Sequence, residues 1–549
     1  MKYLKGLLAC SRENGCVLLF CASMFLFLLA DRLVWRTEIG QINVHGWIAL
    51  LYDLLPLYLL SLAPLLLMGS CAKWLYLPFL IVESVLLVCG WFARCQFQML
   101  LDGDVVGIVL GSSSEEMLWF FRHYASPATV LSVLLIVVFL AGLCKLTLVA
   151  CRRKVTRTTV AVGLGGVLTF LYANRTLDAL IRHETEPFEK QLFGGFLIAD
   201  SCRSWKSFGL LATMKNSPRI PSTVRLSEDQ TNDVVGVVVL GESAARSHWG
   251  LYGYGRDTTP CLCARKDELV VFEDLVSPAF DTAEAMRFAF TTRTLESPFD
   301  LRFTMAQCLR RVGYGVAMFS NQKRWGEWDG DESFDFAGCD PFLFMNEQGE
   351  MNGYDEVLLP YFSDYVTNVT GKAVVFLHLQ GSHVPASGRY PEAGAPFDPE
   401  VLGCPDDAFN PVLTKNHYDN SIWYTDKILG EVIRELEELH KPTWMVYFPD
   451  HGETPSSKSW RTQTDNDLWE IPFVVWTSRA FNEMYPDRVS ALKKARGRAL
   501  QSDQLLYGLL AFSGVEGLGN APRDNFLDAA FHGREKRLIQ NGRAEYRSR

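Results

Sequence analysis

The sequence lacks three features that mark common classes of protein. It has no excess of positive charge, because 53 Lys and Arg stand against 62 Asp and Glu and give a formal net charge of −9. A nucleic-acid-binding surface is basic, so no nucleic acid is expected as a partner. None of the 14 cysteines belongs to a CxxC pair, which excludes a cysteine zinc site. The chain also has no internal repeat and no low-complexity tract, which excludes a repeat array.

Long hydrophobic runs, in contrast, are concentrated before about residue 175. Hydrophobic residues make up 48% of the chain. Five segments are long and apolar enough to cross a bilayer: 16–34, 47–68, 74–93, 127–148 and 158–174. Buried core helices are the alternative, but five such segments in one block favour a membrane domain over 1–175. Between its third and fourth spans, the segment 95–125 is expected to form an outer loop that lies against membrane lipids.

Two basic clusters predict the orientation of this membrane domain, because positively charged loops stay in the cytoplasm. One cluster opens the chain and the other separates the fourth and fifth spans. Their members are Lys2, Lys5 and Arg12, and Lys145, Arg152, Arg153, Lys154 and Arg157. With five spans, the carboxyl-terminal part is then expected outside the cytoplasmic membrane.

Six cysteines lie in the part that is expected to be exported, an oxidising setting. They are Cys202, Cys261, Cys263, Cys308, Cys339 and Cys404. An even number permits three disulfides, but the sequence does not fix the pairing. The other cysteines lie in the membrane part, where we expect them to be buried as small hydrophobic residues.

A polar, proline-containing segment, 176–220, connects the membrane domain to a region with the pattern of an α/β domain, 221–549. Apolar strand candidates alternate there with helical patterns. The candidates are 234–240, 315–319, 373–379, 444–448 and 472–477. This alternation predicts a doubly wound, mostly parallel sheet. The first candidate shows no apolar–polar alternation, which is typical of a central strand covered on both faces.

Residues of metal-ligand type follow three of these strands. Glu242 ends the first, His383 follows the third, and Asp450 and His451 follow the fourth. Ligands bind at the carboxyl ends of parallel strands, so these side chains are expected at one edge of the sheet. Each has a simpler interpretation as a turn or capping residue. Turn chemistry, however, has no reason to select His, Asp and Glu at strand after strand.

A nucleophile is expected in the segment SPAFDTAEAMRFAF, which begins at Ser277 and runs into a helical pattern. Asp281 or Thr282 would lie near the amino terminus of that helix. Free N–H groups and the helix dipole stabilise an oxyanion at such a position. From this segment alone, a capping role for either residue is the simpler interpretation.

Five motifs in one order resemble those of the phosphoethanolamine transferases of the alkaline phosphatase/sulfatase superfamily. They are GESAARSHWGLYGYGRDTTP, the threonine that opens the helix, LHLQGSHVP with RYP, YDNSIWYTD and FPDHGE. The stretch LYGYGRDTTP is most similar to the branch that modifies the lipopolysaccharide core. Lipid A modifiers and mobile polymyxin-resistance enzymes are relatives. The resemblance covers nearly the whole chain and implies five spans in the inner membrane followed by a periplasmic catalytic domain with a sulfatase-like fold.

The resemblance implies a zinc site and a reaction. Glu242, Thr282, Asp450 and His451 match the family's zinc ligands, and Thr282 also matches the nucleophile. The implied reaction transfers phosphoethanolamine from phosphatidylethanolamine to a lipopolysaccharide acceptor, a core sugar or lipid A, through a phosphothreonine. The sequence does not name the acceptor.

The resemblance also implies a donor-binding region. His383 matches a histidine that contacts the donor headgroup or a second zinc, and Asn321 and Gln322 fall where relatives have headgroup-contacting amides. Relatives carry a further histidine after the Asp-His-Gly-Glu motif, whereas 454–473 contains none. One firmly bound Zn²⁺ is therefore expected, and a second only as a weakly bound ion.

Three other functions remain open at this stage. A sulfatase-like hydrolase would need Cys or Ser in a Cys/Ser-x-Pro-x-Arg context, and nothing similar surrounds Thr282. A phosphoglycerol transferase also uses a threonine, so only the donor separates it from the first interpretation. An inactive membrane-anchored binding protein would have a broken ligand set, whereas all four positions are filled here.

The predicted orientation can be tested with reporter fusions. A periplasm-dependent phosphatase fused after Arg549 should be active, and the same reporter fused after Arg153 should be inactive, because the second fusion point lies in the basic loop. The reverse pattern of reporter activity would overturn the orientation.

Overall fold

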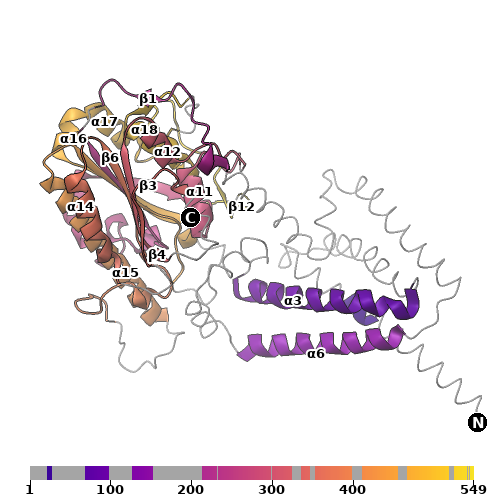
Figure 1. Ribbon diagram of the computed structural model, residues 1–549. Coiled ribbons are helices and arrows are strands. Elements are labelled where there is room, and N and C mark those ends of the chain that lie inside the picture. Colours follow the sequence, from indigo (N-terminus) through magenta and orange to yellow (C-terminus); the bar gives the residue numbers. More distant parts are fainter. Residues whose placement is uncertain are drawn as a thin grey trace, which may run out of the picture. The chain divides into compact units, whose positions relative to one another are not determined.

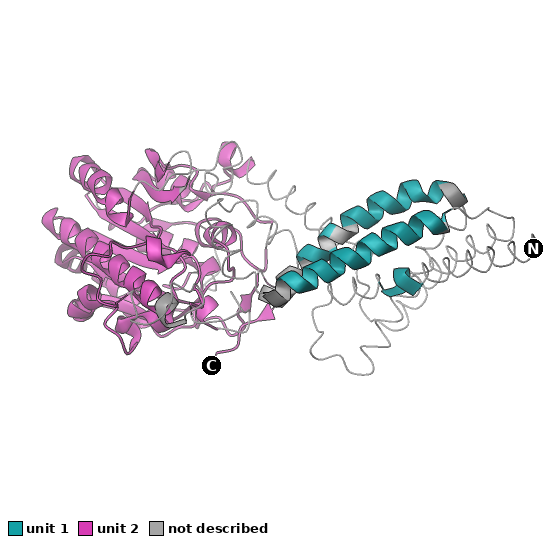
Figure 2. Cartoon of the chain, turned by 90° about the horizontal axis from the view of Figure 1, so that it is seen from below, with its two compact units in different colours: residues 1–110, 123–204 teal, residues 111–122, 205–549 magenta. Residues whose placement is uncertain are grey.

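The computed structural model describes most of the carboxyl-terminal domain and parts of the membrane region. The described residues are 22–26, 68–97, 127–151, 213–230, 233–297, 299–323, 335–346, 353–398, 411–455, 466–518, 525–540, 542 and 544–548. They fall into two compact units, one made of 1–110 and 123–204 and the other of 111–122 and 205–549 (Figure 2).

The first unit contains two long helices that lie side by side, α3 (Lys73–Phe97) and α6 (Pro127–Ala150) (Figure 1). They cover the third and fourth expected spans. Among the described helices, one segment, Val130–Val149, is long and apolar enough to cross a membrane. Its one buried hydroxyl, Thr147 Oγ1, donates to Leu143 O at 2.8 Å, which satisfies it within the helix. The fifth expected span, the second except residue 68, the first except residues 22–26, and residues 98–125 of the outer loop lie outside the described residues.

The second unit is built on an eight-stranded sheet with the order β5-β4-β6-β2-β7-β8-β3-β9. The strands are β2 (Val235–Gly241), β3 (Leu269–Val276), β4 (Gly315–Lys323), β5 (Phe342–Asn346), β6 (Ala373–His378), β7 (Thr443–Pro449), β8 (Glu470–Thr477) and β9 (Leu500–Gln501). Strand β8 pairs antiparallel with both β7 and β3, and the other pairings are parallel. The predicted doubly wound, mostly parallel sheet is confirmed.

Apolar side chains cover both faces of the central strands. In β2, Val235, Val237 and Val239 join one hydrophobic cluster, while Val238 and Leu240 join the other. The first cluster includes α14 (Leu359–Asn368) and α15 (Pro411–Glu438). The second includes α11 (Thr282–Phe290), α12 (Met305–Arg311) and α18 (Leu505–Phe512) (Figure 1). Burial on both faces explains why β2 shows no alternation in its sequence.

The described end of the connecting segment, 213–220, and the residues that follow it to 230 pack against the rest of the domain, and Gln307 Nε2 donates to Met214 O at 3.1 Å. Residues Arg225–Leu226 form β1, which pairs with β10 (Val515–Glu516). The guanidinium of Arg488 donates to Ser227 Oγ at 2.8 Å and forms an ion pair with Asp229 at 2.6 Å. These contacts fix the segment to the domain that carries the site.

Among the described residues, eight cysteines are free thiols. In the exported part these are Cys261, Cys263, Cys308 and Cys339, so the permitted disulfides are not formed among these four. Cys202 and Cys404 lie outside the described residues. Of the four free cysteines described in the first unit, Cys151 is buried, Cys144 is partly buried, and Cys71 and Cys89 are exposed. The expectation of burial within the protein is wrong for these two: Cys71 lies in the short helix η2 (Gly69–Ala72), and Cys89 lies on α3, which turns many of its apolar side chains outward.

Candidate metal centre

The candidate site lies where three neighbouring parallel strands end. Strands β6, β2 and β7 are adjacent in that order, with Leu240 opposite His378 and Gly241 opposite Pro449. Their carboxyl ends therefore lie at the same edge of the sheet. Glu242, the loop that carries His383, and Asp450 with His451 emerge there together, as the sequence predicted.

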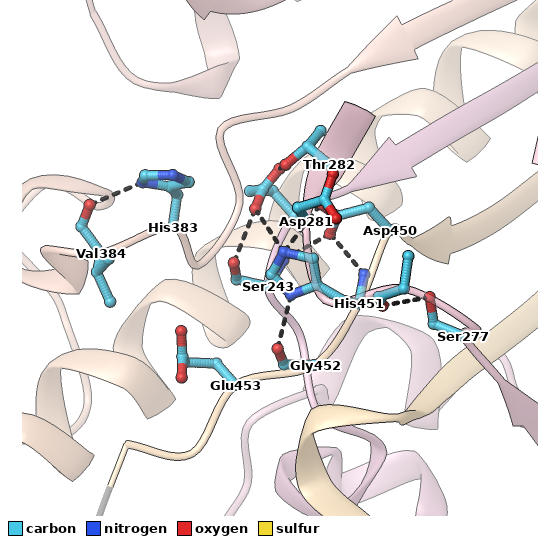
Figure 3. A network of polar contacts seen from close by, with 12 residues as sticks. Ser243, Ser277, Asp281, Thr282, His383, Val384, Asp450, His451, Gly452 and Glu453 are labelled. Carbon is cyan, nitrogen blue, oxygen red and sulfur yellow. Dashed lines mark hydrogen bonds and ion pairs between the residues drawn. The ribbon is translucent and has the colours of Figure 1, made fainter. Parts of the chain in front are cut away.

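Three buried side chains form a group that can hold a metal ion: Glu242, Asp450 and His451. One ligand atom from each lies within 4.8 Å of the others. Thr282 joins them from the first turn of α11, and its hydroxyl donates to Glu242 Oε2 at 3.1 Å. Figure 3 shows Thr282, Asp450 and His451 converging from separate elements.

The alternative roles of Asp281 and Thr282 are now distinguished. Asp281 is the N-cap of α11, and its Oδ1 accepts from the backbone N–H of Glu284 at 2.9 Å. Thr282 is the first residue of the helix, so its hydroxyl is not needed as a cap and points instead to Glu242. The capping interpretation holds for Asp281, and Thr282 is the residue that faces the metal group.

The tautomer of His451 follows from its surroundings. Its Nδ1 lies 2.7 Å from the carbonyl oxygen of Gly452, which can only accept a hydrogen bond, so Nδ1 carries the proton. In the neutral ring, Nε2 then presents a lone pair. This atom lies 3.3 Å from Asp450 Oδ2 and 3.8 Å from Glu242 Oε1. A metal-binding histidine has this arrangement, with its other ring N–H donated to a carbonyl.

One of the two carboxylate oxygens of Asp450, Oδ2, accepts no hydrogen bond. Asp450 Oδ1 accepts from the N–H groups of Ser243 at 2.9 Å and His451 at 2.7 Å, whereas Oδ2 is buried and accepts none. Burial raises the pKa of Asp450, but the charge of His451 in its protonated form and the N–H of Ser243 together lower it more, so without a metal the pKa of Asp450 lies below the usual range. A buried carboxylate oxygen that faces a second carboxylate and an imidazole lone pair is stabilised by a positive charge placed among them, which a metal ion or a proton can supply. The group therefore fits a metal ion with oxygen and nitrogen ligands.

Glycine is required where the loop after β6 passes Glu242. Gly381 has φ +50°, and a Cβ there would lie 2.8 Å from the backbone nitrogen of Glu242 and 2.9 Å from its oxygen. The next residue, Ser382, donates its N–H to Glu242 O at 2.9 Å. Asp355 accepts from the N–H groups of Gln380 at 2.7 Å and Gly381 at 3.0 Å, which holds the loop in place.

The other predicted site residues are not part of the metal group. His383 lies on the loop after β6, with Nδ1 2.7 Å from Val384 O (Figure 3). Asn321 is buried and donates to Asp355 Oδ1 at 2.9 Å. Gln322 donates to Leu379 O at 2.8 Å. The two amides therefore brace the ends of β4 and β6, and their role in headgroup binding stays a prediction, as does that of His383.

Two of the sequence motifs are hydrogen-bonded to each other in the structure. Asp419 of YDNSIWYTD accepts three hydrogen bonds from the segment after β2. The donors are His248 Nδ1 at 2.7 Å, the Tyr254 hydroxyl at 2.9 Å and Arg256 at 2.7 Å. On the same helix, the Ser421 hydroxyl donates to Tyr418 O at 2.7 Å and is hydrogen-bonded to Ser382 Oγ at 2.9 Å. Helix α15 thus anchors the loops that follow both β2 and β6.

These supporting residues were not found as individual sites in the sequence. Tyr418, Asp419 and Ser421 were visible only as members of a motif, and their partners lie in other parts of the chain. The stretch YDN, in which polar residues interrupt an amphipathic helix and are all buried, is the signal that could have found them.

The sulfatase family matches residues 235–515, which is just over half of the 549 residues. The chain belongs to the sulfatase family. Within it, relatives named phosphoethanolamine transferase confirm the resemblance seen in the motifs. EptC of Escherichia coli (strain K12) is 30% identical over 266 residues, 46% of this chain and 46% of its own length. EptA of Helicobacter pylori is 26% identical over 446 residues, 78% of this chain and 80% of its own. The chain thus spans about half the length of the curated relatives with the strongest matches.

Solved structures of this family show the same fold. The integral membrane phosphoethanolamine transferase EptA of Neisseria meningitidis matches with a TM-score of 0.63 and 20% identity, over 93% of this chain and 99% of its own. The periplasmic domain of E. coli EptC matches with a TM-score of 0.53 and 23% identity, over 60% of this chain and 96% of its own. A second structure of that domain is a complex with Zn. The fold class, a helical membrane domain followed by a sulfatase-like α/β domain, is confirmed.

Gly381→Ala should weaken metal binding, because the new Cβ would displace the backbone of Glu242 and strain a left-handed residue. We expect the affinity for Zn²⁺, measured by chelator competition, to fall by about tenfold or more, as for other supporting contacts of metal ligands. Gly388→Ala is the matched control, since a Cβ there meets nothing within 4 Å. Equal affinity in the two variants would show that Gly381 does not place Glu242.

Proposed function

We propose that the protein transfers phosphoethanolamine from phosphatidylethanolamine to a lipopolysaccharide acceptor through a phosphothreonine at Thr282. The observation that carries this proposal is the hydrogen bond from the Thr282 hydroxyl to Glu242 inside the buried metal group. The relatives are named phosphoethanolamine transferases, which supports phosphoethanolamine as the transferred group. A lone threonine is a weak nucleophile, so its placement against a carboxylate and a metal group is the feature to explain.

Glu242, Asp450, His451 and Thr282 would hold one Zn²⁺, as the family resemblance of the motifs implies. When bound, zinc lowers the pKa of a coordinated hydroxyl and stabilises negative charge on phosphoryl oxygens. Two carboxylates, one imidazole and one hydroxyl oxygen match the four-coordinate oxygen and nitrogen sites that zinc adopts. We propose that a second zinc at His383 is bound only weakly, because 454–473 contains no histidine.

The residues of the chain support a double displacement. Glu242 Oε2 accepts the hydroxyl hydrogen of Thr282 and is placed to take its proton. Thr282 Oγ1 forms a bond to phosphorus while the bond from phosphorus to the diacylglycerol oxygen breaks, and diacylglycerol leaves with a proton. An acceptor hydroxyl or phosphate oxygen then attacks phosphorus, the bond to Oγ1 breaks, and Thr282 regains its proton. The N–H groups at the start of α11 favour the phosphoryl charge throughout.

A membrane domain suits an enzyme whose two proposed substrates are lipids. Both the proposed donor and the proposed acceptor are membrane lipids, and the described helix α6 carries a segment able to cross a bilayer. The basic loop before the fifth expected span favours a periplasmic location for the metal group, with the chain anchored in the inner membrane. A tethered enzyme meets both lipids at the membrane surface without extracting either.

The covalent intermediate tests this function. Given phosphatidylethanolamine without an acceptor, the purified protein should accumulate phosphoethanolamine on Thr282, detected by peptide mass spectrometry of the segment from Ser277 to Arg287. Thr282→Ala should abolish both the adduct and the transfer, and Thr282→Ser should retain part of each because it keeps the hydroxyl.

Ser277→Ala is the matched control, since the hydroxyl of Ser277 is buried and donates to Ala279 O at 2.9 Å. This variant should form the adduct normally. An adduct that disappears in Ser277→Ala, or transfer that persists in Thr282→Ala, would remove Thr282 from the mechanism. An adduct that forms with phosphatidylglycerol instead would identify a phosphoglycerol transferase.

A further inference from the structure

One strained residue contacts both carboxylates of the metal group. Ser243 follows Glu242 and has φ 54°, a left-handed conformation that a serine rarely adopts. In this conformation its N–H donates to Asp450 Oδ1 at 2.9 Å and its hydroxyl donates to Glu242 Oε1 at 2.7 Å. The orientation of both carboxylates therefore depends on the backbone of a single residue.

The hydroxyl of Tyr418 holds this residue in place. It donates to the carbonyl oxygen of Ser243 at 2.8 Å and accepts from the N–H of Ala245 at 2.8 Å. Tyr418 lies on α15 and its side chain is buried, so water does not replace these contacts. A buried backbone group that loses its partner is destabilising by an amount comparable to the cost of a left-handed residue.

We propose that Tyr418 is a positioning residue that sets the two carboxylates of the metal centre through the backbone of Ser243. Without its hydroxyl, Ser243 is free to relax to an extended conformation. Its N–H then turns away from Asp450 and its hydroxyl turns away from Glu242. This inference rests on the metal centre of the proposed function, but it concerns metal binding and can be tested without the transfer reaction.

The same helix supplies a matched control. The hydroxyl of Tyr424 is also on α15 and donates to Glu356 Oε2 at 2.9 Å, and its side chain is buried as well. Tyr424→Phe and Tyr418→Phe each remove one hydrogen-bonded hydroxyl from one helix. The Tyr418 hydroxyl bonds to the segment that follows β2, whereas the Tyr424 hydroxyl bonds to Glu356, so the two variants separate a general loss of stability from a loss of positioning.

The experiment measures Zn²⁺ affinity of the full-length protein by chelator competition, together with thermal unfolding of the metal-free form. Tyr418→Phe should weaken Zn²⁺ binding by about tenfold or more, the usual effect of losing a supporting contact. It should also slow formation of the Thr282 adduct more than it raises the KM for the donor. Tyr424→Phe should leave Zn²⁺ affinity unchanged. Equal Zn²⁺ affinities in the two variants would overturn the proposal.

A double-mutant cycle with Ser243→Gly tests the route through Ser243. Glycine adopts positive φ without strain, so Tyr418→Phe should weaken Zn²⁺ binding less in the Ser243→Gly background than in the wild type. Fully additive effects would show that Tyr418 does not act through Ser243. Should Tyr418→Phe alone fail to fold, the double variant is expected to fold and bind Zn²⁺, and its failure to do so would count against the proposal.

The outcomes also separate this inference from the proposed function. A selective loss of Zn²⁺ affinity in Tyr418→Phe, with no adduct formed by the wild type, would support the positioning role and reject the transfer reaction. An adduct in the wild type, with unchanged Zn²⁺ affinity in Tyr418→Phe, would do the reverse.

Discussion

The main constraint on this structure is that three buried groups, which repel one another, must be held face to face. The carboxylates of Glu242 and Asp450 and the lone pair of His451 Nε2 lie close together, away from water. Each group alone is costly to bury, and together they repel. A cation among them turns this repulsion into attraction, which makes the arrangement stable and at the same time chemically useful. The proposed reactivity of the Thr282 hydroxyl depends on its hydrogen bond inside this group.

The fold holds these groups together against their repulsion. Parallel pairing brings the ends of β6, β2 and β7 to one edge, so the ligands need only short loops to meet. Helix α15 fixes two of those loops through Tyr418, Asp419 and Ser421. Glycine at position 381 lets the loop after β6 pass directly against Glu242. Placing the metal group on rigid elements explains how it can be prepared before any substrate arrives.

Much of this arrangement could be predicted from the sequence, because the relevant signals are local. The unbroken apolar runs gave the five strand candidates, and the residue types at their ends gave Glu242, Asp450 and His451. Strand β3 was missed because Glu273 and Asp274 interrupt its apolar pattern, and β5 was missed because it is a short edge strand. The direction of β8 could not be predicted from the sequence, and neither could the roles of Ser243 and Tyr418. All of these depend on contacts between distant parts of the chain.

Anomalous diffraction from crystals of the purified protein, recorded above and below the zinc absorption edge, tests the metal centre most directly. The account predicts a strong zinc peak bonded by Glu242, Asp450, His451 and the Thr282 hydroxyl oxygen, with His451 bound through Nε2. A zinc peak at other residues, or electron density for these four side chains with no metal peak among them in crystals grown with zinc, would contradict it.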